Sequence, residues 1–110
     1  MLVQKNRYSQ LSSVRYNMHA VSAIEEARNK ESVQFSVVLA LGDNDHEYDV
    51  TLPIPYYEKI AKRACTEKEF VEKAFRFLLE HESPDMILSS FEIPLIQSYF
   101  PNFEKEIMSY

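Results

Sequence analysis

The chain has 110 residues, of which 45% are apolar and 26% are charged, and its formal net charge at pH 7 is −5. This length supports one domain with its own core, and the apolar content excludes an intrinsically disordered chain. No apolar run approaches the roughly 20 residues that cross a bilayer, and the opening MLVQKNRYSQ has no apolar signal core, so we expect a cytoplasmic protein without membrane partners. We expect a single domain over 1–110, with 1–12 as a loose N-terminal arm.

Charge is divided unevenly along the chain. Residues 1–30 carry five basic and two acidic side chains, a net charge of +3, whereas residues 31–110 carry seven basic and fifteen acidic ones, a net charge of −8. An acidic body repels phosphate groups. The composition therefore argues against nucleic acid as a partner.

Strands are predicted in the first half of the chain. Apolar and polar residues alternate at 14–20, which predicts a strand that returns through a polar turn at 28–31. The stretch 20–30 has a helix as its alternative, because Ala, Glu, Arg and Lys favour helices. The same alternation at 33–41 and 46–52, around the turn Gly-Asp-Asn-Asp, predicts an antiparallel hairpin.

Helices are predicted after Pro53. Pro55 suits a first helical turn, and an apolar stripe predicts a short helix over 55–64. The segment Thr66-Glu67-Lys68-Glu69 has the pattern of a capping box, and the apolar stripe behind it predicts a longer helix that runs to about Glu82.

Prolines mark two further helices. Ser83-Pro84 predicts a helix over 84–91, and Pro94 begins another that Pro101 ends. Strands therefore precede helices, which indicates an α+β domain. We expect a small antiparallel sheet of two or three N-terminal strands, followed by four short-to-medium helices packed on one face.

Several catalytic classes are excluded by composition. Gly42 is the only glycine, whereas phosphate-binding loops and the nucleophile elbow each need two or more. Cys65 is the only cysteine, which excludes an intrachain disulfide and a thiolate metal cluster within one chain. We expect it to be a small residue packed at a helix end. We predict no catalytic residues and no cofactor.

Metal binding is also not expected. The run from Asp43 to Glu47 begins like a calcium loop, but Tyr48 occupies the position that needs glycine and Ile54 the position of the bidentate Glu. The three histidines lack the spacing that places two imidazoles on one helical face. They are His19, His46 and His81.

Two alternatives remain open. The order strand, helix, helix from Asp49 to His81 superficially looks like a ribbon-helix-helix DNA-binding regulator, but its strand offers Glu47 and Asp49 where base edges call for basic or amide groups. A small enzyme or ligand-binding protein with a site near His46 is the second alternative, and its predicted lining is Tyr48, His46, Glu47 and Asp49.

The second half of the chain resembles a known group of proteins. From about Asp49 to Glu104 it contains the patterns F-x-F-L-L-E-x-E, I-L-x-x-F and I-x-x-Y-F-P in that order. This order is similar to that of a family of small, stand-alone bacterial proteins of unknown function. The resemblance implies a fold unit and a bacterial cytoplasmic setting, and it implies no catalytic residue.

Aromatic residues crowd the C-terminal segment, and such side chains often anchor interfaces. The candidate interaction surface is Phe91, Leu95, Tyr99, Phe100 and Phe103. The alternative is that these rings close the core, with Phe100 against Phe75, Leu78 or Leu79, while Tyr110 lies at a loose terminus. We predict a non-enzymatic protein–protein interaction module that binds a protein partner or itself, with a homodimer as one form.

Overall fold

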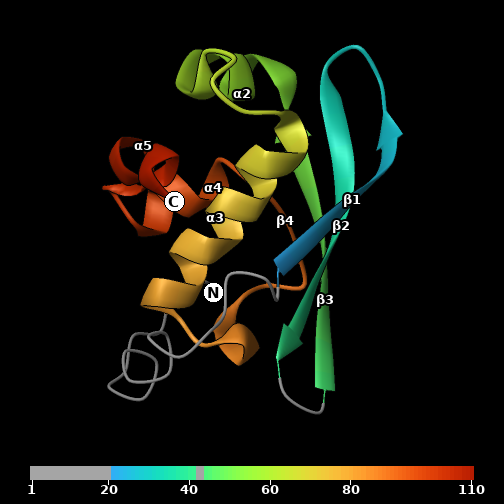
Figure 1. Cartoon of the computed structure of the whole chain (residues 1–110), viewed down its shortest axis with the longest axis vertical. Coiled ribbons are helices and arrows are strands. Elements are labelled where there is room, and N and C mark those ends of the chain that lie inside the picture. Colours follow the sequence, from blue (N-terminus) through green and yellow to red (C-terminus); the bar gives the residue numbers. More distant parts are fainter. Residues whose placement is uncertain (1–20, 42–43) are drawn as a thin grey trace.

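A four-stranded sheet with helices on one face forms the domain (Figure 1). The computed structural model describes residues 21–41 and 44–110. In the described chain the strands lie in the order β1-β2-β3-β4, where β1, β2 and β3 pair antiparallel and β4 pairs parallel with β3. Their bounds are β1 (Val21–Arg28), β2 (Ser32–Leu41), β3 (Asn44–Pro53) and β4 (Ser90–Glu92).

The predicted fold was wrong about this sheet. It is mixed rather than antiparallel, it has four strands rather than two or three, and β4 follows the helices instead of preceding them. Ser89 accepts a backbone hydrogen bond of 2.8 Å from Asp49 and Thr51 accepts one of 2.9 Å from Ile93, which attaches β4 to β3. Three residues are too few to show a strand period, so β4 has no recognisable pattern in the sequence.

The hairpin of β2 and β3 is confirmed, with Val37 opposite Tyr48 near its centre. Residues 21–28 form a strand and not the alternative helix, while the strand predicted at 14–20 lies outside the described residues. The turn before β2 depends on Asn29. Its side-chain Oδ1 accepts hydrogen bonds from the backbone amides of Glu31, at 2.7 Å, and Ser32, at 2.9 Å, as turn-forming Asn side chains do.

The two predicted central helices are present. Helix α2 (Ile54–Ala61) has Pro55 in its first turn and stops before position 64, because Lys62 and Arg63 adopt positive φ angles of 49° and 66°. Helix α3 (Glu67–His81) begins at the predicted capping box. The Thr66 hydroxyl accepts from the Glu69 amide at 3.1 Å, and the Glu69 carboxylate accepts from the Thr66 amide at 2.9 Å.

The helices of the C-terminal segment are shorter than predicted. The helix expected at 84–91 is a single 3-10 turn, η2 (Pro84–Met86), followed by extended chain that leads into β4. Pro94 precedes α4 (Leu95–Tyr99) as predicted, and α5 (Phe103–Glu106) and η3 (Ile107–Ser109) complete the fold.

The core lies between the sheet and the helical layer, with α3 across the sheet (Figure 1). Tyr48 shows how the layers connect, since its ring centroid is 5.2 Å from that of Phe75 on α3 and its hydroxyl donates to the Pro84 carbonyl at 2.8 Å. Phe75 also lies 5.9 Å from Phe91 of β4. Among the described helices, none has the length and apolarity needed to cross a bilayer.

Candidate functional site

The aromatic residues predicted as an interaction surface lie mostly inside the domain. Phe91 and Phe100 are each 8% exposed, and Phe103 is fully buried. Leu95 is half-buried, and Tyr99 reaches solvent with 40% of its surface exposed. Three of the five residues therefore contribute to the core, and Tyr99 with part of Leu95 remains on the surface of the helical layer.

Phe77 of α3 is the centre of this aromatic cluster. Its ring centroid lies 5.8 Å from that of Phe100, 5.1 Å from that of Phe103 and 5.7 Å from that of Tyr110, all at steep, edge-on angles. Edge contacts of this kind are favourable because the ring edge is positive and the ring face negative. Phe100 thus packs on the long helix, and its ring partners there are Phe77 and His81.

Tyr110 is not loose, contrary to the expectation from its terminal position. Besides packing on Phe77, it donates a hydrogen bond of 3.0 Å to the Glu80 carboxylate. Burial and this hydrogen bond raise the pKa of Tyr110 to about 12. The terminus is therefore part of the fold.

The opposite face of the sheet is not covered by any of the described elements. In Figure 1 the helices α2 to α5 all lie on one side of the strands, and no described helix covers the other side. We call this second side the open face, and its outward residues follow from strand alternation and exposure. They are Ser22 and Ile24 of β1; Gln34, Ser36, Val38 and Ala40 of β2; Asp45, Glu47, Asp49 and Thr51 of β3; and Ser90 and Glu92 of β4.

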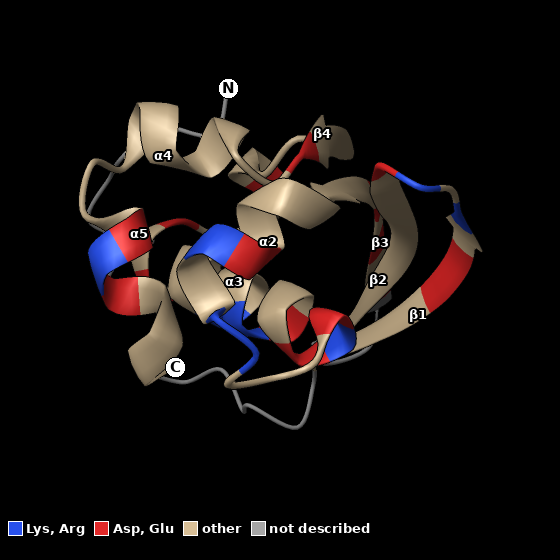
Figure 2. Cartoon of the chain, turned by 90° about the horizontal axis from the view of Figure 1, so that it is seen from above, with Lys and Arg blue, Asp and Glu red and all other residues tan. Residues whose placement is uncertain are grey.

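The open face has an apolar half and an acidic half. Ile24 is 55% exposed, and Val38, one strand over, is half-buried. Asp45, Glu47 and Asp49 form a row of exposed carboxylates along β3. The outward residues of the open face include no Lys or Arg, whereas Figure 2 shows basic and acidic positions mixed over α2, α3 and α5. Charge of one sign is thus concentrated on this side of the sheet.

A hollow of about 320 Å³ deepens the open face next to the acidic row. It collects residues from all four strands, including two carboxylates, from Asp49 and from Glu26 at the bulge of β1. The lining residues are Glu26, Gln34, Phe35, Asp49, Val50, Thr51 and Ser90. The hollow thus combines hydrogen-bond acceptors with negative charge, which suits a cationic group.

The free edge of β1 is protected against pairing with another strand. The Glu72 carboxylate on α3 accepts a hydrogen bond of 3.0 Å from the backbone amide of Ala23, which points toward the free edge of β1. Glu26 lacks a partner in β2, and the resulting bulge interrupts the edge. Arg28 then joins β1 to α3, because its guanidinium contacts Glu67 at 2.6 Å. Bulges, charges and covering groups are known means of preventing edge-to-edge association.

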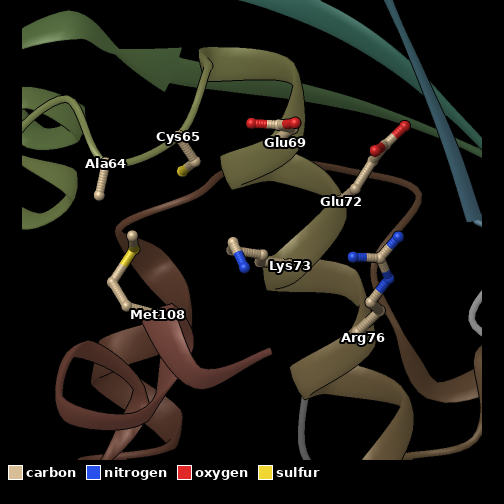
Figure 3. Close-up of a pocket in the computed structure, with 7 residues that line it drawn as sticks. All are labelled: Ala64, Cys65, Glu69, Glu72, Lys73, Arg76 and Met108. Carbon is tan, nitrogen blue, oxygen red and sulfur yellow. The ribbon is translucent and has the colours of Figure 1, made fainter.

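A second hollow lies along α3, on the helical side of the molecule (Figure 3). Its volume is about 390 Å³, and it is bounded by α3, the loop after α2, and η3. The lining residues are Ala64, Cys65, Glu69, Glu72, Lys73, Arg76 and Met108. Burial raises the pKa of the Cys65 thiol, which is therefore neutral at physiological pH.

The residues considered for metal binding and catalysis are scattered. His81 lies at the end of α3 in the aromatic cluster, His46 is half-buried on β3, and His19 falls outside the described residues. Among residues 21–41 and 44–110, no group of three or more His, Cys, Asp or Glu side chains is placed to hold a metal ion. Of the four residues predicted to line a site near His46, Asp49 lines the hollow of the open face, whereas His46, Glu47 and Tyr48 line neither of the two hollows.

The position of β3 also bears on the ribbon-helix-helix alternative. In that class of protein a strand pairs with the same strand of a second copy, which requires a free edge. β3 lies between β2 and β4 and is bonded to both. It has no free edge over Asp49–Thr51, which argues against this alternative.

The open face could be recognised only in part from the sequence. The exposed carboxylates of β3 follow from the alternation of polar and apolar residues in that strand. Ile24, in contrast, lies in the stretch 20–30, for which the sequence left a strand and a helix as alternatives. One signal for the open face was present in the sequence. In the alternating run that begins at Val21, Ile24 is an apolar residue at a position on the polar side.

Comparisons of this chain with protein-family models, with curated proteins and with solved structures find no match. The resemblance to a small bacterial family of unknown function therefore stays a prediction. Function has to be argued from the surface of the molecule itself.

Proposed function

We propose that this protein is a non-enzymatic interaction module, and that its open face binds a partner protein through a basic segment that also carries apolar side chains. One observation carries the proposal: the exposed Ile24 and the carboxylate row of β3 share a sheet face that no described helix covers. The first supplies apolar area to bury, and the second supplies charge that selects the partner.

The geometry of the acidic row favours an extended partner segment. Asp45, Glu47 and Asp49 are two residues apart along one strand, so their side chains repeat every ~7 Å on the same face. An extended segment with Lys or Arg at every second position has the same repeat. Apolar side chains in that partner would then lie over Ile24 and Val38.

Charge also favours a different protein over a second copy of this one. In a symmetric dimer the open face would bring a second set of the same carboxylates into the interface, and like charges at an interface cost affinity. The other route to a dimer, pairing of two β1 edges, is obstructed by the Glu72 cap and the bulge at Glu26.

Affinity capture with two matched variants tests the proposal. The open-face variant combines Ile24→Ser, Glu47→Lys and Asp49→Lys. The control variant combines Tyr99→Ser and Glu58→Lys, which changes the other large exposed apolar residue among those described and reverses an exposed charge on α2. Each protein is immobilised, exposed to extract from its source cells, and compared by quantitative mass spectrometry.

We expect the native protein and the control variant to capture the same partner, and the open-face variant to lose at least ~90% of it, since charge reversal turns attraction into repulsion. Circular dichroism melting must show that all three proteins are equally folded. Loss of the partner in the control variant alone would assign the interaction to the Tyr99 surface. Equal capture by all three would remove the open face from the account.

A further inference from the structure

The hollow on α3 contains positive charge that residues 21–41 and 44–110 leave uncompensated. The Nε of Arg76 is buried, and it has no hydrogen-bond acceptor among the described residues. Lys73, one helical turn earlier, is in none of the ion pairs that the described part of the chain forms. Both side chains line the same hollow (Figure 3). A buried donor next to a cavity that has no acceptor among the described residues is a candidate contact for a bound ligand.

Both carboxylates that line this hollow accept hydrogen bonds from other groups of the protein, but only one of them is also paired with a lysine. Glu72 accepts from the Lys68 ammonium at 2.6 Å as well as from the Ala23 amide at 3.0 Å, so its charge is matched by Lys68. Glu69 accepts from the Thr66 amide in the capping box. Lys73 and Arg76 therefore bring two positive charges to the hollow, and only the carboxylate of Glu69 is left to offset them. The resulting net positive charge favours binding of an anion.

The remaining walls favour an organic molecule over a bare ion. Ala64, Cys65 and Met108 provide small, apolar or weakly polar surfaces opposite α3 (Figure 3). Because the thiol of Cys65 is neutral, it adds no negative charge that would repel an anion. The volume of about 390 Å³ falls at the lower end of the range of small-molecule sites, ~300–1,000 Å³.

We infer that this hollow binds a small organic oxyanion, meaning a carboxylate or phosphate group on a short apolar body, with Arg76 and Lys73 as its anion-binding residues. The planar guanidinium offers parallel N–H donors to two oxygens of such a group, and the ammonium adds a point charge. The apolar body lies against Ala64, Cys65 and Met108. The site shares no lining residue with the hollow of the open face and does not depend on the proposed function.

Titrations followed by ¹H–¹⁵N NMR spectra test the inference. The labelled full-length protein is titrated separately with sodium phosphate and with sodium butyrate, and sodium chloride at equal ionic strength is the reference. We expect saturable shifts of the amides at 64–76 and 107–109 with at least one of the two anions. The anion with the lower Kd identifies the head group as phosphate or carboxylate.

Four variants separate a binding role from a structural one. Arg76→Gln should raise Kd ~10-fold, as expected for a lost charge-assisted hydrogen bond. Lys73→Gln should raise it ~3-fold. Glu69→Gln should lower it ~2- to 5-fold, because Gln still completes the capping box while one repelling charge is removed. Lys105→Gln, an exposed change on α5 away from the hollow, should leave Kd unchanged.

Three results would overturn the inference. They are the absence of saturable shifts with both anions, the same shifts with chloride, and an unchanged Kd in both the Arg76 and Lys73 variants. If Arg76→Gln proves unfolded by its amide spectrum, the opposite effects expected for Lys73→Gln and Glu69→Gln decide the matter. A failure here would leave the open face proposal untouched, because that proposal is tested by capture of a protein.

Discussion

The two faces of the sheet are formed by the same strands but have different roles. One face packs against the helices, and the other lies at the surface. Toward the helices, Phe35, Val37 and Val50 are almost completely removed from solvent. On the other face, Ser36 and Asp49, which are their neighbours in sequence, remain at the surface, as does Glu47. Burial of the first set supplies most of the stability, since apolar burial is the main favourable contribution to folding. The second set is thereby free to carry charge that would be costly inside.

The same contrast appears between adjacent residues of the C-terminal segment. Phe100 packs against Phe77, whereas Tyr99 is 40% exposed. A dense run of aromatic residues in a sequence therefore does not by itself indicate an interface. Which rings are exposed depends on the direction of each side chain in a short helix, and α4 has only five residues.

The largest expected effect is at the centre of the covered side. Phe77→Ala removes the ring that contacts Phe100, Phe103 and Tyr110, and truncation of a buried Phe typically costs ~3–5 kcal/mol. Because a domain has only ~5–15 kcal/mol in total, the variant should be largely or wholly unfolded at moderate urea concentration. Urea melts of Phe77→Ala and Phe100→Ala measure this, with Ile24→Ala as the exposed control.

The comparison of the faces requires Ile24→Ala to melt within ~0.5 kcal/mol of the native protein, as surface substitutions usually do. A cost at Ile24 similar to that at Phe77 would mean that the open face is packed in the folded protein. The distinction between the two faces would then be lost.

An intermediate effect is expected at the edge of β1. Glu72→Ala leaves the Ala23 amide without its acceptor, and an unsatisfied buried donor costs ~1–3 kcal/mol. It also uncovers the strand edge, so the variant should associate with itself more than the native protein does. Urea melts and sedimentation velocity measure the two effects. Glu72→Gln, whose amide oxygen still accepts from Ala23, should lose less stability and associate with itself no more than the native protein does.

A pH-dependent effect is expected at Tyr110. Its pKa of about 12 in the folded protein exceeds the ordinary value of 10.0, because burial and the hydrogen bond to Glu80 favour the neutral phenol. The folded state thus holds this proton more tightly than the unfolded state does. The stability it contributes is fully present below pH 10 and is lost as the pH rises through the folded pKa.

Comparison with Tyr110→Phe isolates this contribution. At about pH 8 the native protein should be more stable than the variant, and by about pH 11 the difference should shrink or reverse. Tyr56→Phe should show the same trend, since burial and a hydrogen bond of 2.9 Å to Glu104 also raise the pKa of Tyr56. A difference that grows with pH would show that these hydroxyls do not have the environments described.

The smallest effect on stability is expected for the open face itself. The combined change Ile24→Ser, Glu47→Lys and Asp49→Lys should shift the free energy of unfolding by no more than ~1 kcal/mol, because all three residues are exposed. The same variant should lose the partner. Large loss of binding with small loss of stability is the pattern that separates a recognition surface from a core.

Parts of this fold with strong local signals were predictable. The hairpin, the start of α3 and the turn before α4 each combine a periodic pattern with a capping or turn residue, such as Thr66 or Pro94. β4 was missed because its three residues gain stability from pairing with β3, which is more than 35 positions earlier, and not from local preference. The anion site was missed for a similar reason. It depends on which carboxylates near Arg76 are already engaged, and Ala23, which engages Glu72, is 49 positions away.

Site-specific photo-crosslinking tests the central claim most directly. A benzoylphenylalanine is placed at Ser22, which is exposed beside Ile24 on the open face, or at Ser98, which is exposed on α4. Each protein is irradiated in its source cells, and the adducts are identified by mass spectrometry. The account predicts a heterotypic adduct from position 22 and none from position 98, with the adduct lost when Glu47→Lys and Asp49→Lys are added. Adducts from position 98 alone, or only self-adducts from position 22, would contradict it.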